Sequence, residues 1–341
     1  MTALGASPAP EGISSRPSAN ALLRLQAPVR DRLDEVTEVM WNAVATDAPL
    51  VAQMSAHLMA MRGKMFRPTL VLLASDVENR AESRAISLAA AVELIHLATL
   101  VHDDAVDHSV LRRGMPTLNS LFNHQISVIM GDFLYSTALN RLVAVGNIDA
   151  LRALTRASTE MTVGELQQLT AVSPLEATED DYFALIRAKT ASLMSAACEI
   201  GALCGAANHR ETLARFGELL GMTFQITDDL IDYTEAASTT GKPAGIDLRE
   251  HKVTLPLIYA LRQMDEQARG KVEALFAAAT PEDADIAEVI SLVAENGGLD
   301  YARSVAARYA NEAEGELGSL PDTVARTALF ESISYVMERH A

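Results

Sequence analysis

Apolar residues recur every three or four positions along nearly the whole chain after residue 20. The first such series contains Leu22, Leu25, Val29, Leu33, Val36 and Met40. This spacing is that of an amphipathic α-helix, whereas no stretch of useful length alternates apolar and polar residues as a half-buried strand does. No repeat with a period of 20–50 residues is present, which excludes a solenoid. The chain is therefore predicted to be all-α, with one large helical bundle at residues 21–341.

Glycine, proline and short polar runs divide this pattern into separate helices. We expect helices at about residues 68–79, 81–107, 126–145, 150–171, 178–206 and 210–233, followed by a loop at 234–247. Further helices follow, with breaks at Pro281, Asn296 and Pro321. Residues 1–20 are rich in Ala, Ser and Pro and contain no apolar run. We predict that they form a disordered arm and not a secretory signal.

The net charge of −17 limits the partners expected for this chain. Nucleic acid is not an expected partner, because a protein that binds it needs a basic surface. An anionic substrate would require cations concentrated at one place. Cys198 and Cys204 have no metal-binding spacing, and we expect buried free thiols in a reducing compartment. No uninterrupted apolar run reaches the ~18 residues of a membrane span, which predicts a cytoplasmic protein without a transmembrane segment.

Two acidic clusters with the same spacing, Asp-Asp-x-x-Asp, interrupt apolar helical stretches. The first contains Asp103, Asp104 and Asp107, and the second contains Asp228, Asp229 and Asp232. The outer two carboxylates of each cluster lie on one helix face, where like charges destabilise a helix. Mg²⁺ would offset this cost, since it commonly binds one or two carboxylates together with substrate phosphates. One cluster alone is typical of a solvated helix end, but two with identical spacing indicate a site for metal and phosphate.

Basic residues gather in short motifs around these clusters despite the acidic composition. They are Lys64 and Arg67, Arg112 and Arg113, Lys189, Lys242, and Lys252. Each pair alone would usually be a solvated surface pair. Together they indicate a polyphosphate site, because Lys and Arg bind phosphate oxygens and Arg can do so through two N–H groups.

Glu93 and His96 form a Glu-x-x-His pair on a predicted helix, as in di-iron bundle proteins. Such centres need a second pair of this kind and two further glutamates, and no second pair lies on an apolar helix of this sequence. His96 lies about two turns before Asp103 on nearly the same face. We therefore expect His96 to lie near the metal site without binding the metal, or to be a hydrogen-bonded core histidine.

The motifs and their order resemble the trans-isoprenyl diphosphate synthase (polyprenyl synthetase) family. The resemblance covers nearly the whole chain after the arm. It includes Gly63-Lys64-x-x-Arg67-Pro68, His96, both acidic clusters, Arg112-Arg113-Gly114, Gly131-Asp132, Lys189-Thr190, Phe224-Gln225 and residues 241–252. Departures from the usual pattern are Arg62, Met65-Phe66, Ile246 and His251, where the family commonly has Gly, Arg-Leu, Asn and Gly. None of these is a principal ligand position.

The resemblance implies helices around a deep central cavity, a homodimer, and head-to-tail condensation of isopentenyl diphosphate onto an allylic diphosphate. It implies catalytic roles for Asp103, Asp104, Asp107, Lys189, Asp228 and Asp229. Mg²⁺, or Mn²⁺ in its place, would be held by Asp103, Asp107 and Asp228, with Asp104, Asp229 and Asp232 in support. The allylic substrate would contact Arg112, Lys189, Thr190, Gln225, Lys242 and Lys252. Isopentenyl diphosphate would contact Gly63, Lys64, Arg67, His96 and Arg113.

Product length in this family depends on what blocks the cavity below the first acidic cluster. Bulky aromatics at the fourth and fifth positions before the first Asp form a floor there, and this chain has the small residues Ala98 and Thr99 instead. The resemblance therefore implies an open path, with the helix containing Val128, Ile129 and Met130 as the next barrier. A medium-to-long product for quinone side chains is expected. The alternative is that the two small residues only allow close helix packing.

Other interpretations stay open at this stage. A class I terpene cyclase also ionises a diphosphate, but it needs no second-substrate site such as Lys64, Arg67 and His96, and its second metal motif usually contains Asn, Ser or Glu. A non-catalytic subunit of a heteromeric prenyl synthase typically lacks the acidic motifs. A short-chain farnesyl or geranylgeranyl diphosphate synthase is the alternative for product length.

Overall fold

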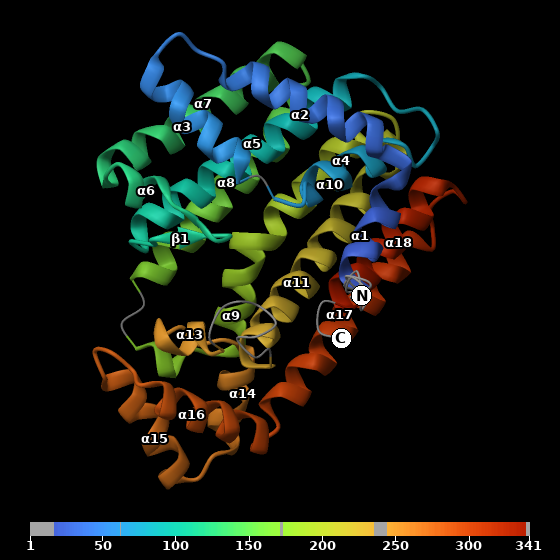
Figure 1. Cartoon of the computed structure of the whole chain (residues 1–341). Helices are drawn as coiled ribbons and strands as arrows, with labels where there is room; N and C mark the ends of the chain where they lie inside the picture. Colours follow the sequence, from blue (N-terminus) through green and yellow to red (C-terminus); the bar gives the residue numbers. More distant parts are fainter. Residues whose placement is uncertain (1–16, 62, 171–172, 235–243, 339–341) are drawn as a thin grey trace, which may run out of the picture.

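The computed structural model describes residues 17–61, 63–170, 173–234 and 244–338. These segments form a bundle of helices, which confirms the all-α prediction (Figure 1). The first part of the chain contains α1 (Pro17–Gln26), α2 (Arg30–Val44), α3 (Pro49–Ala60), α4 (Phe66–Ser75), α5 (Arg84–Val106), α6 (Leu118–Leu121), α7 (His124–Val145) and α8 (Ile148–Leu169). The second part contains α9 (Glu179–Ile186), α10 (Ser192–Ala202), α11 (Arg210–Thr234), α13 (Ile246–Arg249), α14 (Leu255–Gln263), α15 (Glu266–Ala277), α16 (Asp283–Glu295), α17 (Gly298–Leu317) and α18 (Val324–Met337).

Shorter elements connect these helices. Single 3₁₀ turns are η1 (Ala27–Val29), η2 (Pro174–Glu176) and η4 (Ala207–His209), and η3 (Arg187–Ala191) is one turn of π-helix. Within the described residues the strands are β1 (Leu111–Arg112) and β2 (Met115–Pro116), which pair antiparallel.

Several helices begin and end at residues that satisfy free backbone groups. The side chain of Asn123 accepts a hydrogen bond from the Ile126 N–H at the start of α7, and Asn147 caps the start of α8 in the same way. Between them, Gly146 closes α7 with a φ of 72°, a conformation that glycine adopts without strain. The break predicted at this point is therefore confirmed.

Helix α5 lies at the centre of the bundle and is buried on most sides from Ala85 to Ala105. It is apolar around its circumference, as expected of a helix surrounded by others. Helices α2, α4 and α7 pack against it. Helix α10 packs against both α5 and α11, which are the helices that contain the two acidic clusters. The position of one cluster relative to the other is therefore set by the packing of α10.

Helices α13 to α16 lie at the end of the molecule away from α2 and α3 (Figure 1). They have a small apolar core of their own, which includes Leu257, Ala260, Val272, Leu275 and Val289. This end includes α13, the first described helix after the second acidic cluster, which packs against α11.

Three local features differ from the sequence prediction. The predicted helix at 178–206 is divided into α9 and α10 by the π turn η3, which contains Lys189. The two strands were not predicted, and their connection places Arg113 and Gly114 at φ values of 53° and 75°. Residues 17–20 of the predicted arm belong to α1, while the rest of the arm lies outside the described residues.

By length and composition alone, α5 and α7 are apolar enough to cross a membrane. In α5, 67% of the most apolar window is buried inside the molecule, against 28% in α7. The two helices pack against each other, so α5 is a core helix and α7 leaves one side exposed. Cys198 and Cys204 are buried free thiols, as predicted.

Candidate active site

The first acidic cluster lies at the C-terminal end of α5. Asp103 is half-buried and Asp107 is exposed, while Asp104 is only 5% exposed. The Nε–H of Arg112 lies 2.9 and 3.0 Å from the two carboxylate oxygens of Asp104. The inner carboxylate is therefore neutralised by an arginine of the hairpin, whereas Asp103 and Asp107 are less buried.

In the second cluster, near the end of α11, the second aspartate is again more buried than the first. Asp228 is exposed and Asp229 is buried. The hydroxyl of Tyr182 donates to Asp229 Oδ2 at 2.6 Å, and Gln225 Nε2 donates to Oδ1 at 2.8 Å. Thr190 in turn donates to Gln225 Oε1 at 2.7 Å. The predicted residues Thr190, Gln225 and Asp229 thus belong to one hydrogen-bonded chain.

Asp232, the last residue of the second cluster, binds the start of α13. Its carboxylate accepts hydrogen bonds from the backbone N–H groups of Ile246 and Asp247, at 3.0 and 2.9 Å. Both groups lie at the start of α13, where N–H groups have no partner within the helix. Asp232 is therefore an anchor for α13 in this structure.

Lys189 lies in the π turn and faces α8. Its Nζ is 2.5 Å from Glu165 Oε2 and 2.7 Å from Gln168 Oε1. The turn fits against α11 because Gly221 has no side chain: a Cβ there would lie 2.5 Å from Ala191 Cα. π turns inserted in α-helices occur frequently at functional sites, where they redirect side chains.

Lys252 interacts electrostatically with Asp107 of the first cluster and with Asp247, which follows the second cluster in the chain. Burial alone would lower its pKa, but Glu250, Asp107 and Asp247 together raise it above the usual value. Asp107 belongs to the first cluster, and Asp247 interacts with Asp228 and Asp232 of the second. The two clusters therefore face a common region that contains Lys252. Lys242, the other lysine predicted here, lies outside the described residues.

The carboxylates of this region are destabilised in their charged form by burial and, to a smaller extent, by neighbouring negative charge. Burial raises the pKa of Asp103 to about 6, with Lys189 and Arg112 acting in the opposite direction and Glu165 and Asp107 adding to the rise. Burial and the neighbouring Asp232 raise the pKa of Asp247 to about 7. Bound cations would lower both pKa values, because they favour the charged form of a carboxyl group.

The donor atoms fit a hard divalent cation. Every side chain of the two clusters offers carboxylate oxygen, the ligand type that Mg²⁺ prefers. In the described part of the chain, no three His, Cys, Asp or Glu side chains converge to form a complete metal centre. The arrangement therefore suits a metal that takes its remaining ligands from a substrate phosphate or water.

A second group of predicted residues converges around His96, about two turns before Asp103 on α5. Arg67 Nη1 and His96 Nε2 are 3.2 Å apart, and Arg113 Nη1 donates to the Met61 carbonyl at 2.7 Å. The guanidinium of Arg113 lies against Gly63, where a Cβ would be 2.6 to 2.9 Å from it. Gly63 is therefore needed for this close approach.

His96 is neutral in this setting. Burial, followed by the charges of Arg67, Arg113 and Arg112, holds the pKa of His96 well below its usual value. Because arginine only donates hydrogen bonds, Nε2 of His96 is the acceptor and its proton lies on Nδ1. Lys64 lies apart from these residues: it is exposed, and its Nζ lies 5.5 Å from the centre of the Tyr335 ring on α18.

Three residues that bind predicted site residues are not predictable from the motifs. Glu165 and Gln168 bind Lys189, and Tyr182 binds Asp229. The spacing Glu-x-x-Gln, which puts both side chains on one helix face, was the available signal for the first two. Tyr182 gave no signal, since a tyrosine on an amphipathic helix is most often a core residue.

The residues expected to set product length lie on two neighbouring helices. Ala98 is 1% exposed, and the half-buried Thr99 donates its hydroxyl hydrogen bond to the His96 carbonyl. Met130 is buried at 1% exposure, but Ile129 is 66% exposed. On the helix expected to form the next barrier, Met130 is therefore the residue that faces the core, while Ile129 lies on the surface of the chain.

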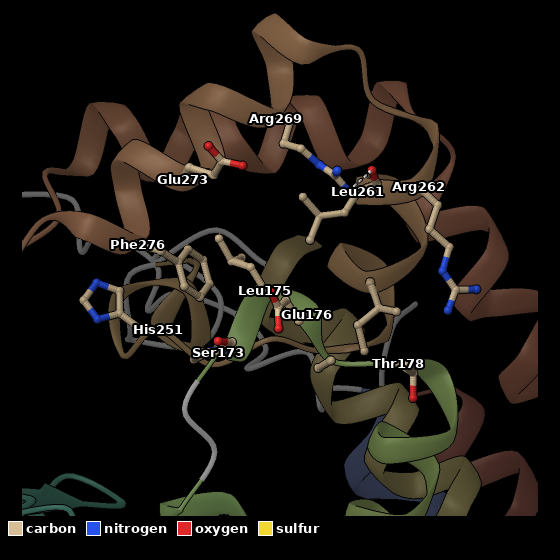
Figure 2. Close-up of a pocket in the computed structure, with 13 residues that line it drawn as sticks. Ser173, Leu175, Glu176, Thr178, His251, Leu261, Arg262, Arg269, Glu273 and Phe276 are labelled. Atoms are coloured by element: carbon tan, nitrogen blue, oxygen red, sulfur yellow. Dashed lines mark hydrogen bonds between the residues drawn. The ribbon is translucent and has the colours of Figure 1, made fainter.

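A separate groove of about 810 Å³ lies between α14, α15 and the segment 173–178 (Figure 2). Leu175, Leu261 and Phe276 are among its apolar residues, and none of the predicted site residues lines it. His251 lies at its edge, 5.4 Å from the Phe276 ring centre, with a φ of 55°. That left-handed conformation explains why glycine is common at this position in the family that the sequence resembles.

An all-α bundle in which two carboxylate clusters lie near lysine and arginine side chains suits an enzyme that binds diphosphate esters together with divalent cations. The model of the polyprenyl synthetase family matches residues 48–293. The chain belongs to this family of prenyltransferases. It is 37% identical over 315 residues to an all-trans-nonaprenyl-diphosphate synthase (geranyl-diphosphate specific) from Rhodobacter capsulatus. The aligned region covers 92% of this chain and 96% of the relative.

Two solved structures are similar along nearly the whole chain. A decaprenyl diphosphate synthase from Rhodobacter capsulatus superimposes with a TM-score of 0.89 at 36% identity, covering 94% of this chain and 99% of the other. A polyprenyl synthase from Caulobacter crescentus, complexed with calcium and isoprenyl diphosphate, gives a TM-score of 0.88 at 34% identity, covering 94% and 98%.

Proposed function

We propose that this chain is an all-trans polyprenyl diphosphate synthase that condenses isopentenyl diphosphate head-to-tail onto an allylic diphosphate. The observation that supports this most is the shared design of the two acidic clusters. In each, the second aspartate is buried and accepts a hydrogen bond from another element, while the first is more exposed. Lys189 acts electrostatically on Asp103, and Asp107 acts on Lys252. Such a site suits a diphosphate bound together with cations.

The proposed reaction begins with ionisation of the allylic C–O bond, which leaves negative charge on the departing diphosphate. Arg112, Lys189 and Lys252 stabilise that charge electrostatically. The C=C bond of isopentenyl diphosphate then attacks the carbocation, and a proton is lost. The released diphosphate is the base for this proton. Apolar side chains of the bundle exclude water, which would otherwise quench the cation.

Mg²⁺, or Mn²⁺ in its place, would be held by Asp103, Asp107 and Asp228 and would supply further neutralisation of the leaving diphosphate. The raised pKa of Asp103 and the oxygen-only donor set support this assignment. The Caulobacter crescentus relative was solved with calcium and isoprenyl diphosphate, which supports divalent-metal binding in the family.

Isopentenyl diphosphate is assigned to the group formed by Gly63, Arg67, His96 and Arg113. Two guanidinium groups and a neutral imidazole converge there, apart from the acidic clusters. Lys64 is assigned to the edge of this site, beside Tyr335 of α18. Arginine suits this role because its N–H groups match the geometry of phosphate oxygens.

A medium-to-long product, used for quinone side chains, is proposed from the small residues at Ala98 and Thr99. The nonaprenyl and decaprenyl synthases among the relatives support this over a farnesyl or geranylgeranyl product. Thr99 is the partly exposed member of the pair, so it is the position at which an added aromatic ring would meet the growing chain first.

We propose that two copies of the chain pair through α7 and α8 and that the enzyme is cytoplasmic. Large apolar side chains are exposed on these neighbouring helices, namely Ile129, Val143, Val163, Leu166 and Leu169. Their burial against a second copy would explain why only 28% of the apolar window of α7 is buried in one chain. Light scattering of the purified protein tests the dimer.

The decisive experiment uses the purified chain alone with labelled isopentenyl diphosphate, an allylic diphosphate and Mg²⁺, and separates the products by length. Incorporation of isopentenyl units into a long all-trans product is expected. Conversion of the allylic substrate without isopentenyl incorporation would instead indicate a terpene cyclase. Activity only after addition of a second protein would indicate a subunit of a heteromeric synthase.

A further inference from the structure

Glu93 lies on α5, one helical turn before His96, and has no role in the chemistry described so far. It is 3% exposed in a helix that is otherwise almost entirely apolar. Its Oε2 atom is buried without a hydrogen-bond partner among the described residues, and so is Nε of Arg67. A buried carboxylate is costly unless charged neighbours compensate for it.

The compensating neighbours are two arginines assigned above to isopentenyl diphosphate. Burial raises the pKa of Glu93, and the charges of Arg67 and Arg113 act against that rise. Burial lowers the pKa of Arg67 and of Arg113, and the negative charge of Glu93 acts against this decrease. The positive charge of Arg113 lowers the pKa of Arg67 further. Glu93 is therefore the carboxylate that attracts both guanidinium groups.

Glu199 shows what a fully paired glutamate looks like in the same fold. It is equally buried, at 4% exposure, and it is bound by two arginines. Arg156 donates to Oε2 at 2.5 Å, and Arg210 donates to Oε1 at 2.9 and 2.6 Å. At Glu93, by contrast, no hydrogen bond joins the carboxylate to Arg67 or Arg113 among the described contacts. Arg67 Nη1 contacts His96 and Arg113 Nη1 donates to the Met61 carbonyl, so Glu93 attracts both guanidinium groups without occupying their other N–H groups.

We propose that Glu93 is a positioning residue for isopentenyl diphosphate, because its carboxylate keeps the guanidinium groups of Arg67 and Arg113 together against their mutual repulsion. The inference rests on the proposed function of that site. Without the negative charge, the two cations would separate or lose order, and the diphosphate would have to bring them together at the expense of binding energy.

The experiment compares Glu93→Gln, which removes the charge at nearly constant shape, with Glu93→Asp, which keeps it. Glu199→Gln is the matched control. Steady-state KM values for isopentenyl diphosphate and for the allylic substrate are measured together with melting temperatures. Binding of isopentenyl diphosphate alone is measured by calorimetry, so that the inference is tested even where turnover fails.

We expect Glu93→Gln to raise the KM and the calorimetric Kd for isopentenyl diphosphate about tenfold, the effect of one lost charge-assisted interaction. Its KM for the allylic substrate should change less than twofold. Glu93→Asp should restore most of the affinity. Glu199→Gln should lower the melting temperature and leave both KM values unchanged.

An unchanged KM and Kd for isopentenyl diphosphate in Glu93→Gln would overturn the inference, and so would an equal rise for both substrates. If Glu93→Gln does not fold, Glu93→Asp provides the test. Near-native affinity of Glu93→Asp for isopentenyl diphosphate supports the inference, whereas a loss of that affinity at a native melting temperature contradicts it. Failure of the wild-type chain to condense the two substrates would instead contradict the proposed function.

Discussion

Tyr182 offers a direct test of whether the inner aspartates orient the outer ones. In Tyr182→Phe the ring stays and only the hydroxyl is lost, with its 2.6 Å hydrogen bond to Asp229. A hydrogen bond to a charged partner contributes about 1.5–3 kcal/mol. Gln225 still holds the other oxygen of Asp229, so we expect the lower end of this range. That corresponds to a decrease in kcat of about tenfold.

A matched control exists elsewhere in the chain. Tyr301 donates to Glu179 Oε2 over the same distance, 2.6 Å, and that carboxylate also keeps a second partner, Arg262. Tyr301→Phe should leave kcat unchanged. The Mg²⁺ concentration for half-maximal rate should rise in Tyr182→Phe alone, because Asp228 adjoins the residue that loses its anchor. Equal kcat losses in both variants, or an unchanged Mg²⁺ dependence in Tyr182→Phe, would refute the reasoning.

Four further outcomes are expected. Asp103→Ala and Asp228→Ala should each lower the rate by orders of magnitude without loss of fold by circular dichroism, and turnover of either variant in chelator would contradict the metal assignment. Arg67→Ala should raise the KM for isopentenyl diphosphate more than Lys64→Ala does, since Lys64 lies beside Tyr335 at the edge of the site; the reverse order would count against the assignment. The pKa of Asp247 is raised to about 7 in the metal-free folded chain, so the folded chain binds the proton of this carboxyl group more tightly than the unfolded chain does. The contribution of Asp247 to the free energy of unfolding therefore falls as the pH rises toward 7. Asp247→Asn should therefore melt higher than wild type at alkaline pH, with the difference vanishing in acid. Thr99→Phe should shorten the product with turnover retained, as separation of products by length would show, and an unchanged product would place the floor elsewhere.

The site residues that could be predicted from the sequence are those that belong to a short motif with a recognisable spacing. An Asp-Asp-x-x-Asp run on an apolar helix has a like-charge cost that can be recognised without any tertiary contact. The Arg112-Arg113-Gly114 run was recognised as cationic, but its geometry was not. Arg113 adopts φ 53° in a two-residue hairpin turn that also needs Gly114, and only the pairing of β1 with β2 reveals that turn.

The partners of Lys189 could not be predicted for a different reason. Glu165 and Gln168 lie on the preceding helix, and their contact with Lys189 depends on the π turn between α9 and α10. That turn follows from packing, since Gly164 and Gly221 let α8 and α11 approach it closely. Sequence periodicity continues through such a turn almost unchanged, so the segment was predicted as one helix.

The division between inner and outer aspartates explains why both clusters have two adjacent acids and not one. A single aspartate at a helix surface has free rotation, and its carboxylate would have to be ordered when a metal binds, which costs conformational entropy. In each cluster the adjacent, buried aspartate is fixed by donors from another element: Arg112 of the hairpin for Asp104, and Tyr182 of α9 for Asp229. Each buried aspartate therefore attaches its helix end to a separate part of the fold, and we propose that this positions Asp103 and Asp228 before a ligand binds.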